Sequence, residues 1–181
     1  MTRLAINHTI HCKDEKATAE AVQILANAIL TFYASTPKKP QSFFMSLHGD
    51  LGAGKTTATR YLLQAMGYQG KVKSPTYSLC EAHILDLPNE ALHVFHFYLY
   101  RMQSPVEWVD AGLLEHFTQS EYPTLCIIEW PEKAKYTLPT MDLAITLIHP
   151  QETQSELART VEITAQTPKG EAVLQSLSAH P

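Results

Sequence analysis

Apolar residues along the chain follow two periods, one typical of strands and one typical of helices. Continuous apolar runs at 42–47 (SFFMSL) and 124–130 (TLCIIEW) predict buried strands. Other apolar segments predict a short edge strand within 1–12, a hairpin of 77–85 and 92–97, and an antiparallel pair of 142–148 and 159–165. Helices are expected at 15–33, 57–66 and 171–177, so both kinds of element occur throughout the chain.

Shorter helices are expected between the hairpin and the second buried strand. Ser104 has the character of an N-cap and Pro105 that of a first helical residue, so a helix is predicted to begin there. A further short helix is expected at 112–117. The proline-rich segment 35–40 is expected to be a surface loop.

Composition narrows the class of protein. A chain of 181 residues with 45% hydrophobic residues is expected to form one domain with a proper core. Its net charge of −4 and isoelectric point near 6.1 argue against a general binder of nucleic acid or of membrane surfaces.

Three cysteines, Cys12, Cys80 and Cys126, are widely separated and fit no metal-ligand pattern. We expect them to be reduced and mostly buried thiols. No run has the length of a membrane span, and no signal peptide is recognised at the N-terminus. The expected location is therefore the cytoplasm, without a membrane partner.

Residues 49–56 (GDLGAGKT) have the spacing of a phosphate-binding loop, with Thr57 behind them. The glycines permit backbone angles that turn successive N–H groups toward phosphate oxygens. The strand 42–47 enters the loop and the helix 57–66 leaves it, so the helix dipole adds to an anion site. A glycine-rich turn that binds nothing is the less favoured interpretation. The candidate nucleotide-binding residues are Asp50, Leu51, Gly52, Ala53, Gly54, Lys55, Thr56 and Thr57.

Two of these residues have further roles. Lys55 is expected to place its charge on the β- and γ-phosphates, and Thr56 its oxygen on Mg²⁺. The buried strand 124–130 ends in the acidic residue Glu129, as a Walker B strand ends in Asp. A carboxylate in a salt bridge at the edge of the sheet is the alternative, but the loop favours a metal role. Lys55 and Glu129 are the candidate catalytic residues, and Thr56 and Glu129 the candidate Mg²⁺ ligands.

Two other polar segments are less decisive. The stretch 74–77 (SPTY) offers hydroxyls where a γ-phosphate switch is often found, but a plain proline-containing connection is equally compatible. His96 is more often a structural residue than a catalytic one. Arg101 fits either a phosphate contact or a structural ion pair.

Missing features exclude several nucleotide-binding classes. No Asn-Lys-x-Asp motif is present to read guanine, which argues against a GTPase. The four arginines, at 3, 60, 101 and 159, are few and scattered for a small-molecule kinase. The remaining class is a small ATP-binding domain whose conformational change is transmitted to a partner protein.

Four segments together carry a specific resemblance. Residues 49–57, 74–77, 96–101 (HFYLYR) and 129–132 (EWPE) have the order and spacing of the TsaE (YjeE) family, and the resemblance covers roughly 13–150. These bacterial ATPases are required for threonylcarbamoyladenosine formation on tRNAs that read ANN codons. The chain is similar to them over most of its length.

The resemblance implies a P-loop NTPase-like, three-layer α/β fold with a mixed central sheet, spanning 1–181 as a single ATPase domain. It implies ATP and Mg²⁺ as cofactors, slow hydrolysis, and binding to the TsaD–TsaB heterodimer, with tRNA involved only indirectly. It also implies that 74–77 acts as a switch and that the start of the first helix, near Glu15 and Thr18, approaches the adenine.

One residue departs from the family pattern, which has Asp where this chain has Tyr98. A tyrosine supplies no ionised carboxylate near neutral pH, so we expect ATP binding to survive and hydrolysis to be weaker or to depend on Glu129. Three hypotheses follow, in order of preference: an accessory ATPase of tRNA modification, a nucleotide-gated binding module with little or no hydrolysis, and a small kinase.

Overall fold

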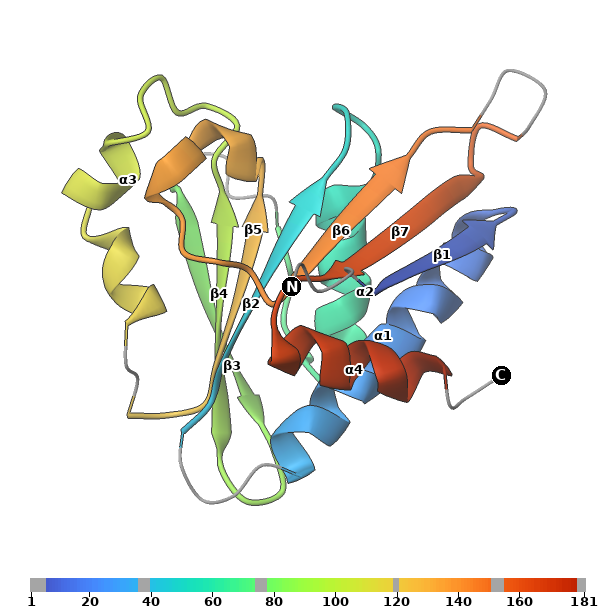
Figure 1. Cartoon of the computed structure of the whole chain (residues 1–181), viewed down its shortest axis with the longest axis horizontal. Helices are drawn as coiled ribbons and strands as arrows, with labels where there is room; N and C mark the ends of the chain where they lie inside the picture. The colour runs from blue at the N-terminus through green and yellow to red at the C-terminus, as the bar shows by residue number, and fades with distance from the viewer. Residues whose placement is uncertain (1–5, 36–39, 74–77, 119–120, 151–154, 179–181) are drawn as a thin grey trace, which may run out of the picture.

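The computed structural model describes residues 6–35, 40–73, 78–118, 121–150 and 155–178. Within these ranges seven strands form one mixed sheet in the order β1-β7-β6-β2-β5-β4-β3 (Figure 1). The strands are β1 (Asn7–Cys12), β2 (Ser42–His48), β3 (Cys80–Asp86), β4 (Ala91–Tyr98), β5 (Thr124–Glu129), β6 (Leu143–Ile148) and β7 (Arg159–Ala165). The helices are α1 (Glu15–Ser35), α2 (Lys55–Ala65), α3 (Glu107–Asp110) and α4 (Pro168–Ser178), and the 3₁₀ turns are η1 (Leu113–Phe117), η2 (Pro131–Lys133) and η3 (Lys135–Thr137).

Strand direction brings several strand ends to one edge. The central strand β2 is parallel to both β5 and β6, and β5 is also parallel to β4. The two outer parts of the sheet are antiparallel: β3 pairs with β4 at one edge, and β7 pairs with both β6 and β1 at the other. Glu129 pairs with Leu47 on one side and Tyr98 on the other, so the ends of three parallel strands lie together. Ligand sites of α/β sheets form at such an edge.

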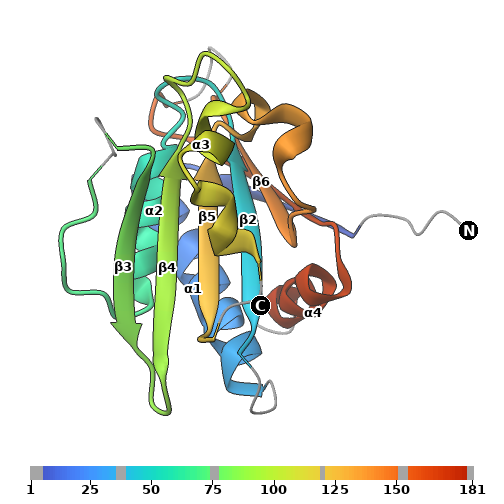
Figure 2. The same ribbon diagram turned by 90° about the vertical axis from the view of Figure 1, so that its left-hand side faces the viewer.

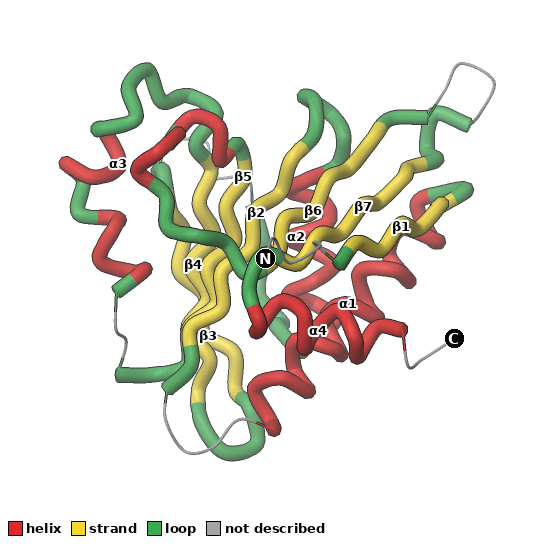
Figure 3. The backbone as a smooth tube through the Cα atoms, in the orientation of Figure 1, coloured by secondary structure: helices red, strands yellow, loops and turns green. Residues whose placement is uncertain are grey.

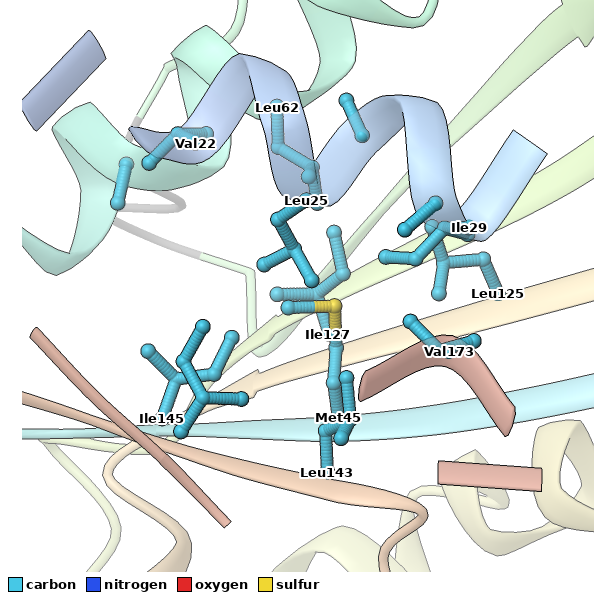
Figure 4. Close-up of a cluster of buried hydrophobic side chains, with 14 of the residues drawn as sticks. Val22, Leu25, Ile29, Met45, Leu62, Leu125, Ile127, Leu143, Ile145 and Val173 are labelled. Atoms are coloured by element: carbon cyan, nitrogen blue, oxygen red, sulfur yellow. The ribbon is translucent and has the colours of Figure 1, made fainter. Parts of the chain in front are cut away.

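Helices cover the sheet on both faces, which gives three layers (Figures 2 and 3). Helices α1, α2 and α4 share one hydrophobic cluster with one face of the sheet, including Ile29, Leu62 and Val173 (Figure 4). A second cluster joins α3, η1 and the turns after β5 to the other face, around Trp108 and Phe97. The fold is therefore the three-layer α/β fold with a mixed sheet that the resemblance implied.

Most elements lie where the sequence predicts them. Both buried strands, the hairpin, the antiparallel pair and the terminal helix are present, and β1 is an edge strand. Helix α2 begins at Lys55, two residues earlier than predicted, because Gly54 occupies its N-cap. The segment 74–77, predicted to be a switch, lies outside the described residues.

One helix start is wrong. Helix α3 begins at Glu107 and not at Pro105. The carboxylate of Glu107 accepts hydrogen bonds from the backbone N–H groups of Gln103 and Ser104, at 2.9 and 2.8 Å, and this forms a turn ahead of the helix. The hydroxyl of Ser104 accepts a hydrogen bond from Val106 N at 3.3 Å, as an N-cap does, but the regular helix starts only after this turn.

A buried aspartate connects the sheet to the last helix. Asp142, 1% exposed, accepts hydrogen bonds from Phe44 N at 2.8 Å and from Thr167 Oγ1 at 2.5 Å. The ammonium of Lys169 lies 3.3 Å from the same carboxylate. Gly170 packs so closely that an added Cβ would lie 1.9 Å from Asp142 O. The glycine therefore permits α4 to approach the chain at Asp142.

The cysteines are free thiols, as predicted: Cys12 and Cys126 are buried and Cys80 is half-buried. Burial is the main reason why the pKa of Cys80 rises to about 12, which keeps it protonated near neutral pH. In the part of the chain that the structure describes, no helix has the length and apolar character required to cross a membrane.

Candidate functional site

The loop between β2 and α2 has a conformation that requires glycine. Gly49 has φ +136°, and a Cβ there would lie 2.5 Å from Leu147 O, while Gly54 has φ +101°. These angles are rarely adopted by residues with a side chain. Ala53 N donates to Asp50 O at 3.1 Å, which closes the turn. The first N–H groups of α2 have no carbonyl partner within the helix and form an anion site together with the helix dipole.

Lys55 folds back onto this loop. Its Nζ donates to Gly49 O at 2.6 Å and Asp50 O at 2.8 Å, and lies 3.9 Å from the centre of the Trp130 ring. Burial lowers the pKa of the Lys55 ammonium, and the nearby carboxylates, Glu129 foremost, oppose that shift. The ammonium is thus held at the loop by two carbonyl groups and one aromatic face.

Thr56 and Glu129, the two predicted Mg²⁺ ligands, lie in contact. Thr56 Oγ1, on the first turn of α2, donates to Glu129 Oε2 at 3.0 Å. A hydroxyl and a carboxylate oxygen are hard ligands of the type that Mg²⁺ takes, together with water and phosphate oxygens. Among the described residues no group of three His, Cys, Asp or Glu side chains is arranged to hold a metal ion. The donor set fits a cation held with a nucleotide.

The second oxygen of Glu129 faces a histidine. His96 Nε2, from β4, lies 2.7 Å from Glu129 Oε1, and both side chains are buried, with 0% and 1% exposed. Each oxygen of this carboxylate therefore has one neighbour that can donate a hydrogen bond.

Lys55, Thr56 and Glu129 line a cleft of about 210 Å³ at the edge of the sheet. Tyr98 lies in its wall beside Glu129, to which it is paired across β4 and β5. Of the described residues that line it, Glu129 alone carries a carboxylate. The lining residues are Leu51, Gly52, Gly54, Lys55, Thr56, Thr57, Tyr98, Glu129 and Trp130.

A second cleft, of about 200 Å³, continues from the first, since Gly52, Gly54 and Thr57 line both. Glu15 and Thr18 at the start of α1 line its outer part. The hydroxyl of Tyr61 donates to Glu15 Oε1. The two clefts therefore adjoin at the loop, and together they offer a phosphate-binding part and a part lined by polar side chains from α1.

Arg159, at the start of β7, holds the loop between the two clefts. Its Nε donates to Ala53 O at 2.9 Å and its Nη2 lies 3.4 Å from Gly52 O. Its Nη1 donates to Glu156 O and Ala158 O, both at 2.6 Å. One guanidinium therefore links the phosphate-binding loop to the segment ahead of β7.

The structure brings most of the predicted site residues together. Lys55, Thr56 and Glu129 meet at the first cleft, with Thr57 and three loop residues in its wall, and Ala53 lies in the wall of the second. Asp50 lines neither cleft, but its carbonyl oxygen accepts from Lys55. Arg101 is exposed and is not among the lining residues of either cleft.

Three contacts of the site are not indicated by the sequence. They are the contact of His96 with Glu129, that of the Trp130 ring with Lys55, and that of Arg159 with the loop. The neighbourhood of His96 and Glu129 follows from adjacent parallel strands, so strand pairing would have found it. Nothing local in the sequence indicates that Arg159 reaches a loop 106 residues earlier.

Size alone does not select this site. A larger cleft, of about 400 Å³, lies between the C-terminal end of α1 and the β3–β4 turn. Asp86 and Glu90 are the charged residues that line it. It offers acidic groups and no cation, so it lacks the chemistry of the loop cleft.

Comparisons with known proteins identify relatives of this chain and a structure of the same fold. The family described as "Threonylcarbamoyl adenosine biosynthesis protein TsaE" matches residues 12–161. The tRNA threonylcarbamoyladenosine biosynthesis protein TsaE of Haemophilus influenzae is 37% identical over 138 residues, covering 76% of this chain and 80% of that protein. The protein of the same name from Bacillus subtilis is 31% identical over 136 residues, covering 75% and 78%. The crystal structure of Bacillus subtilis YdiB has the same fold, with a TM-score of 0.70, 21% identity and 99% of each chain covered.

Proposed function

This chain belongs to the TsaE family of threonylcarbamoyl adenosine biosynthesis proteins, and we propose that it is an ATP-binding ATPase that serves this tRNA modification. The observation that carries the proposal is the meeting of Lys55, Thr56 and Glu129 at one cleft below a phosphate-binding loop. In this proposal 1–181 act as one P-loop ATPase domain.

The loop residues bind the phosphates of ATP. Backbone N–H groups of 50–57 and the dipole of α2 attract the phosphate oxygens, and Lys55 exchanges its two carbonyl partners for β- and γ-phosphate oxygens. Because Lys55 already lies at the loop, its ammonium has only a short way to move. The ring of Trp130 lies against the ammonium of Lys55 and limits the directions in which it can move.

Thr56 and Glu129 hold Mg²⁺ on the nucleotide. When bound, the ion neutralises charge that develops on the phosphates and orients the γ-phosphoryl group. Thr56 Oγ1 turns a lone pair toward the ion, and Glu129 faces it directly or through water. Glu129 is also the candidate to orient the attacking water, because it is the one carboxylate among the described residues of this cleft.

The second cleft receives the ribose and base. It continues from the phosphate cleft and offers the carboxylate of Glu15 and the hydroxyl of Thr18. A carboxylate accepts hydrogen bonds from an amino group such as that of adenine. Arg159 keeps the loop at the entrance to this cleft.

The partner proposed is the TsaD–TsaB heterodimer in the cytoplasm, with tRNA contacted only through that complex and no membrane involved. A stand-alone nucleotide-binding domain does its work when a partner responds to its nucleotide state. The family membership and the nucleotide-site geometry support this placement.

A nucleotide-gated binding module is the second candidate, and Tyr98 is the observation that favours it. Its phenol stands in the wall of the phosphate cleft beside Glu129 and supplies no second carboxylate. In such a module ATP binds and controls the partner, while hydrolysis stays at background.

The test is phosphate release from Mg·ATP by the purified chain, alone and with a TsaD–TsaB pair from the same source, with Lys55→Ala as control. Turnover that appears only with the partners supports the accessory ATPase. ATP binding without turnover in either condition selects the binding module. An unchanged ATP affinity in Lys55→Ala contradicts the assignment of the loop.

A further inference from the structure

We infer that His96 is a positioning residue, which fixes the carboxylate of Glu129 so that its other oxygen faces Thr56. The inference rests on the proposed function, because it concerns the pair of residues proposed to hold Mg²⁺. His96 is a buried strand residue that does not line the cleft. The inference gives it a part in nucleotide binding that acts through Glu129.

The contact geometry supports this role. His96 Nε2 and Glu129 Oε1 are 2.7 Å apart, a short distance for a nitrogen and an oxygen, and both side chains are withdrawn from water. Glu129 Oε2 accepts from Thr56 at 3.0 Å. The two donors come from β4 and α2, so they hold the carboxylate from two separate elements. A carboxylate held at both oxygens cannot rotate freely about its last bond.

The direction of the hydrogen bond follows from the chemistry of the acceptor. A carboxylate oxygen accepts, so the proton of the short contact lies on His96 Nε2. His96 Nδ1 is then left buried without a hydrogen-bond partner. An unpaired buried nitrogen costs stability that an apolar side chain of similar size would avoid. The contact with Glu129 is what distinguishes this imidazole from the buried imidazole of His83, which has no partner at either nitrogen.

The hydrogen bond from His96 matters more for the orientation of Glu129 when Thr56 binds a cation. A threonine hydroxyl that gives a lone pair to a cation no longer points its proton at Glu129 Oε2. The His96 contact is on the other oxygen and on another element, so it does not depend on Thr56. Groups that orient a metal ligand in this way alter metal affinity or activity by about 10–100-fold when they are removed.

His83 offers a matched control on the neighbouring strand β3. It is also buried, 5% exposed, and neither of its ring nitrogens has a hydrogen-bond partner. Its ring packs edge-on against Tyr68, with 4.9 Å between the centroids, and it does not line the phosphate cleft. Replacing it removes a buried imidazole without touching Glu129.

The experiment measures ADP affinity by calorimetry in Mg²⁺ and in EDTA for the wild-type chain and for His96→Leu, His96→Gln and His83→Leu. The measured quantity is the gain in affinity that Mg²⁺ gives. We expect His96→Leu to lower this gain by about 10-fold or more, with the affinity in EDTA unchanged. His96→Gln, whose amide donates from near the position of Nε2, should restore most of the gain, and His83→Leu should retain all of it.

A nitrogen-15 NMR spectrum of the wild-type imidazoles, recorded without nucleotide, gives a second readout that needs no variant to fold. We expect a proton on His96 Nε2, and a bare Nε2 would overturn the inference. If the wild-type chain gains no affinity from Mg²⁺, the proposed Mg²⁺ site and this inference fail together. If the wild-type chain gains affinity and His96→Leu gains as much, this inference alone fails.

Discussion

The contact between Arg159 and the phosphate-binding loop allows a quantitative prediction. Arg159→Met keeps most of the aliphatic stem and removes the guanidinium, so the carbonyl of Ala53 loses its donor at 2.9 Å. Ala53 is 1% exposed, and water does not readily replace the donor. A hydrogen bond that involves a charged group contributes about 1.5–3 kcal/mol at a buried site. The contacts to Gly52 O, at 3.4 Å, and to the exposed Glu156 O add little to this, and the contact to Ala158 O joins adjacent residues and does not involve the loop.

We therefore expect Arg159→Met to lower the free energy of unfolding by about 2 kcal/mol. The affinity for ATP should fall as well, because returning a loop without the Arg159 contact to its binding conformation costs free energy. That penalty cannot exceed the energy of the lost contact, so the dissociation constant should rise by at most about 30-fold. Urea unfolding gives the first quantity and calorimetry the second.

Arg60→Met is the matched control. Arg60 lies on α2 and its Nε donates to the carbonyl of Val72 at 3.3 Å, but it lines neither cleft. It should lower ATP affinity far less than Arg159→Met. If both variants bind ATP as the wild-type chain does, Arg159 does not shape the loop and the reasoning is refuted.

Three further predictions concern single positions. Tyr98→Asp adds a carboxylate beside Glu129, so phosphate release with the partners present should rise; an unchanged rate would mean that Tyr98 does not limit hydrolysis. Gly170→Ala should lower the free energy of unfolding by about 1–3 kcal/mol, because its Cβ would meet Asp142 O at 1.9 Å, and a urea midpoint equal to that of the wild-type chain would contradict this packing. Burial lowers the pKa of His83 in the folded chain from 6.5. As the pH falls, the unfolded chain therefore protonates this imidazole before the folded chain does. Stability from this residue is present above about pH 6.5 and is lost as the pH falls toward the folded pKa; His83→Leu should reduce the drop in urea midpoint between about pH 7.5 and 5.5, and an equal drop would exclude His83 as a source.

The sequence predicts the parts of this fold that depend on local pattern. The strand before Gly49, the helix after Gly54 and the buried strand that ends at Glu129 each have a periodicity or a spacing of their own. Parallel pairing of the two buried strands then places Glu129 near Thr56, which is why the predicted ligands meet.

The parts that could not be predicted depend on contacts between distant segments. Nothing near Arg159 indicates its acceptor at Ala53, and nothing near Asp142 indicates that it receives Phe44 N and Thr167. The error at Ser104 has a different cause, since Ser104 and Glu107 both accept local backbone N–H groups and form a turn from which the regular helix starts two residues later than Pro105. Local rules give the capping residue and do not fix the residue at which regular helix geometry begins.

The position of β7 has a consequence for the chain as it is synthesised. β7 lies between β6 and β1 and so joins the first strand to the rest of the sheet. Its first residue, Arg159, is paired with Cys12 of β1. The ribosome must add 106 residues after Ala53 before Arg159 exists, which takes about 5–20 s at ordinary elongation rates. During that interval the nascent chain holds a complete phosphate-binding motif without the guanidinium that fixes its carbonyls. The loop can gain its Arg159 contact only once the start of β7 has been synthesised.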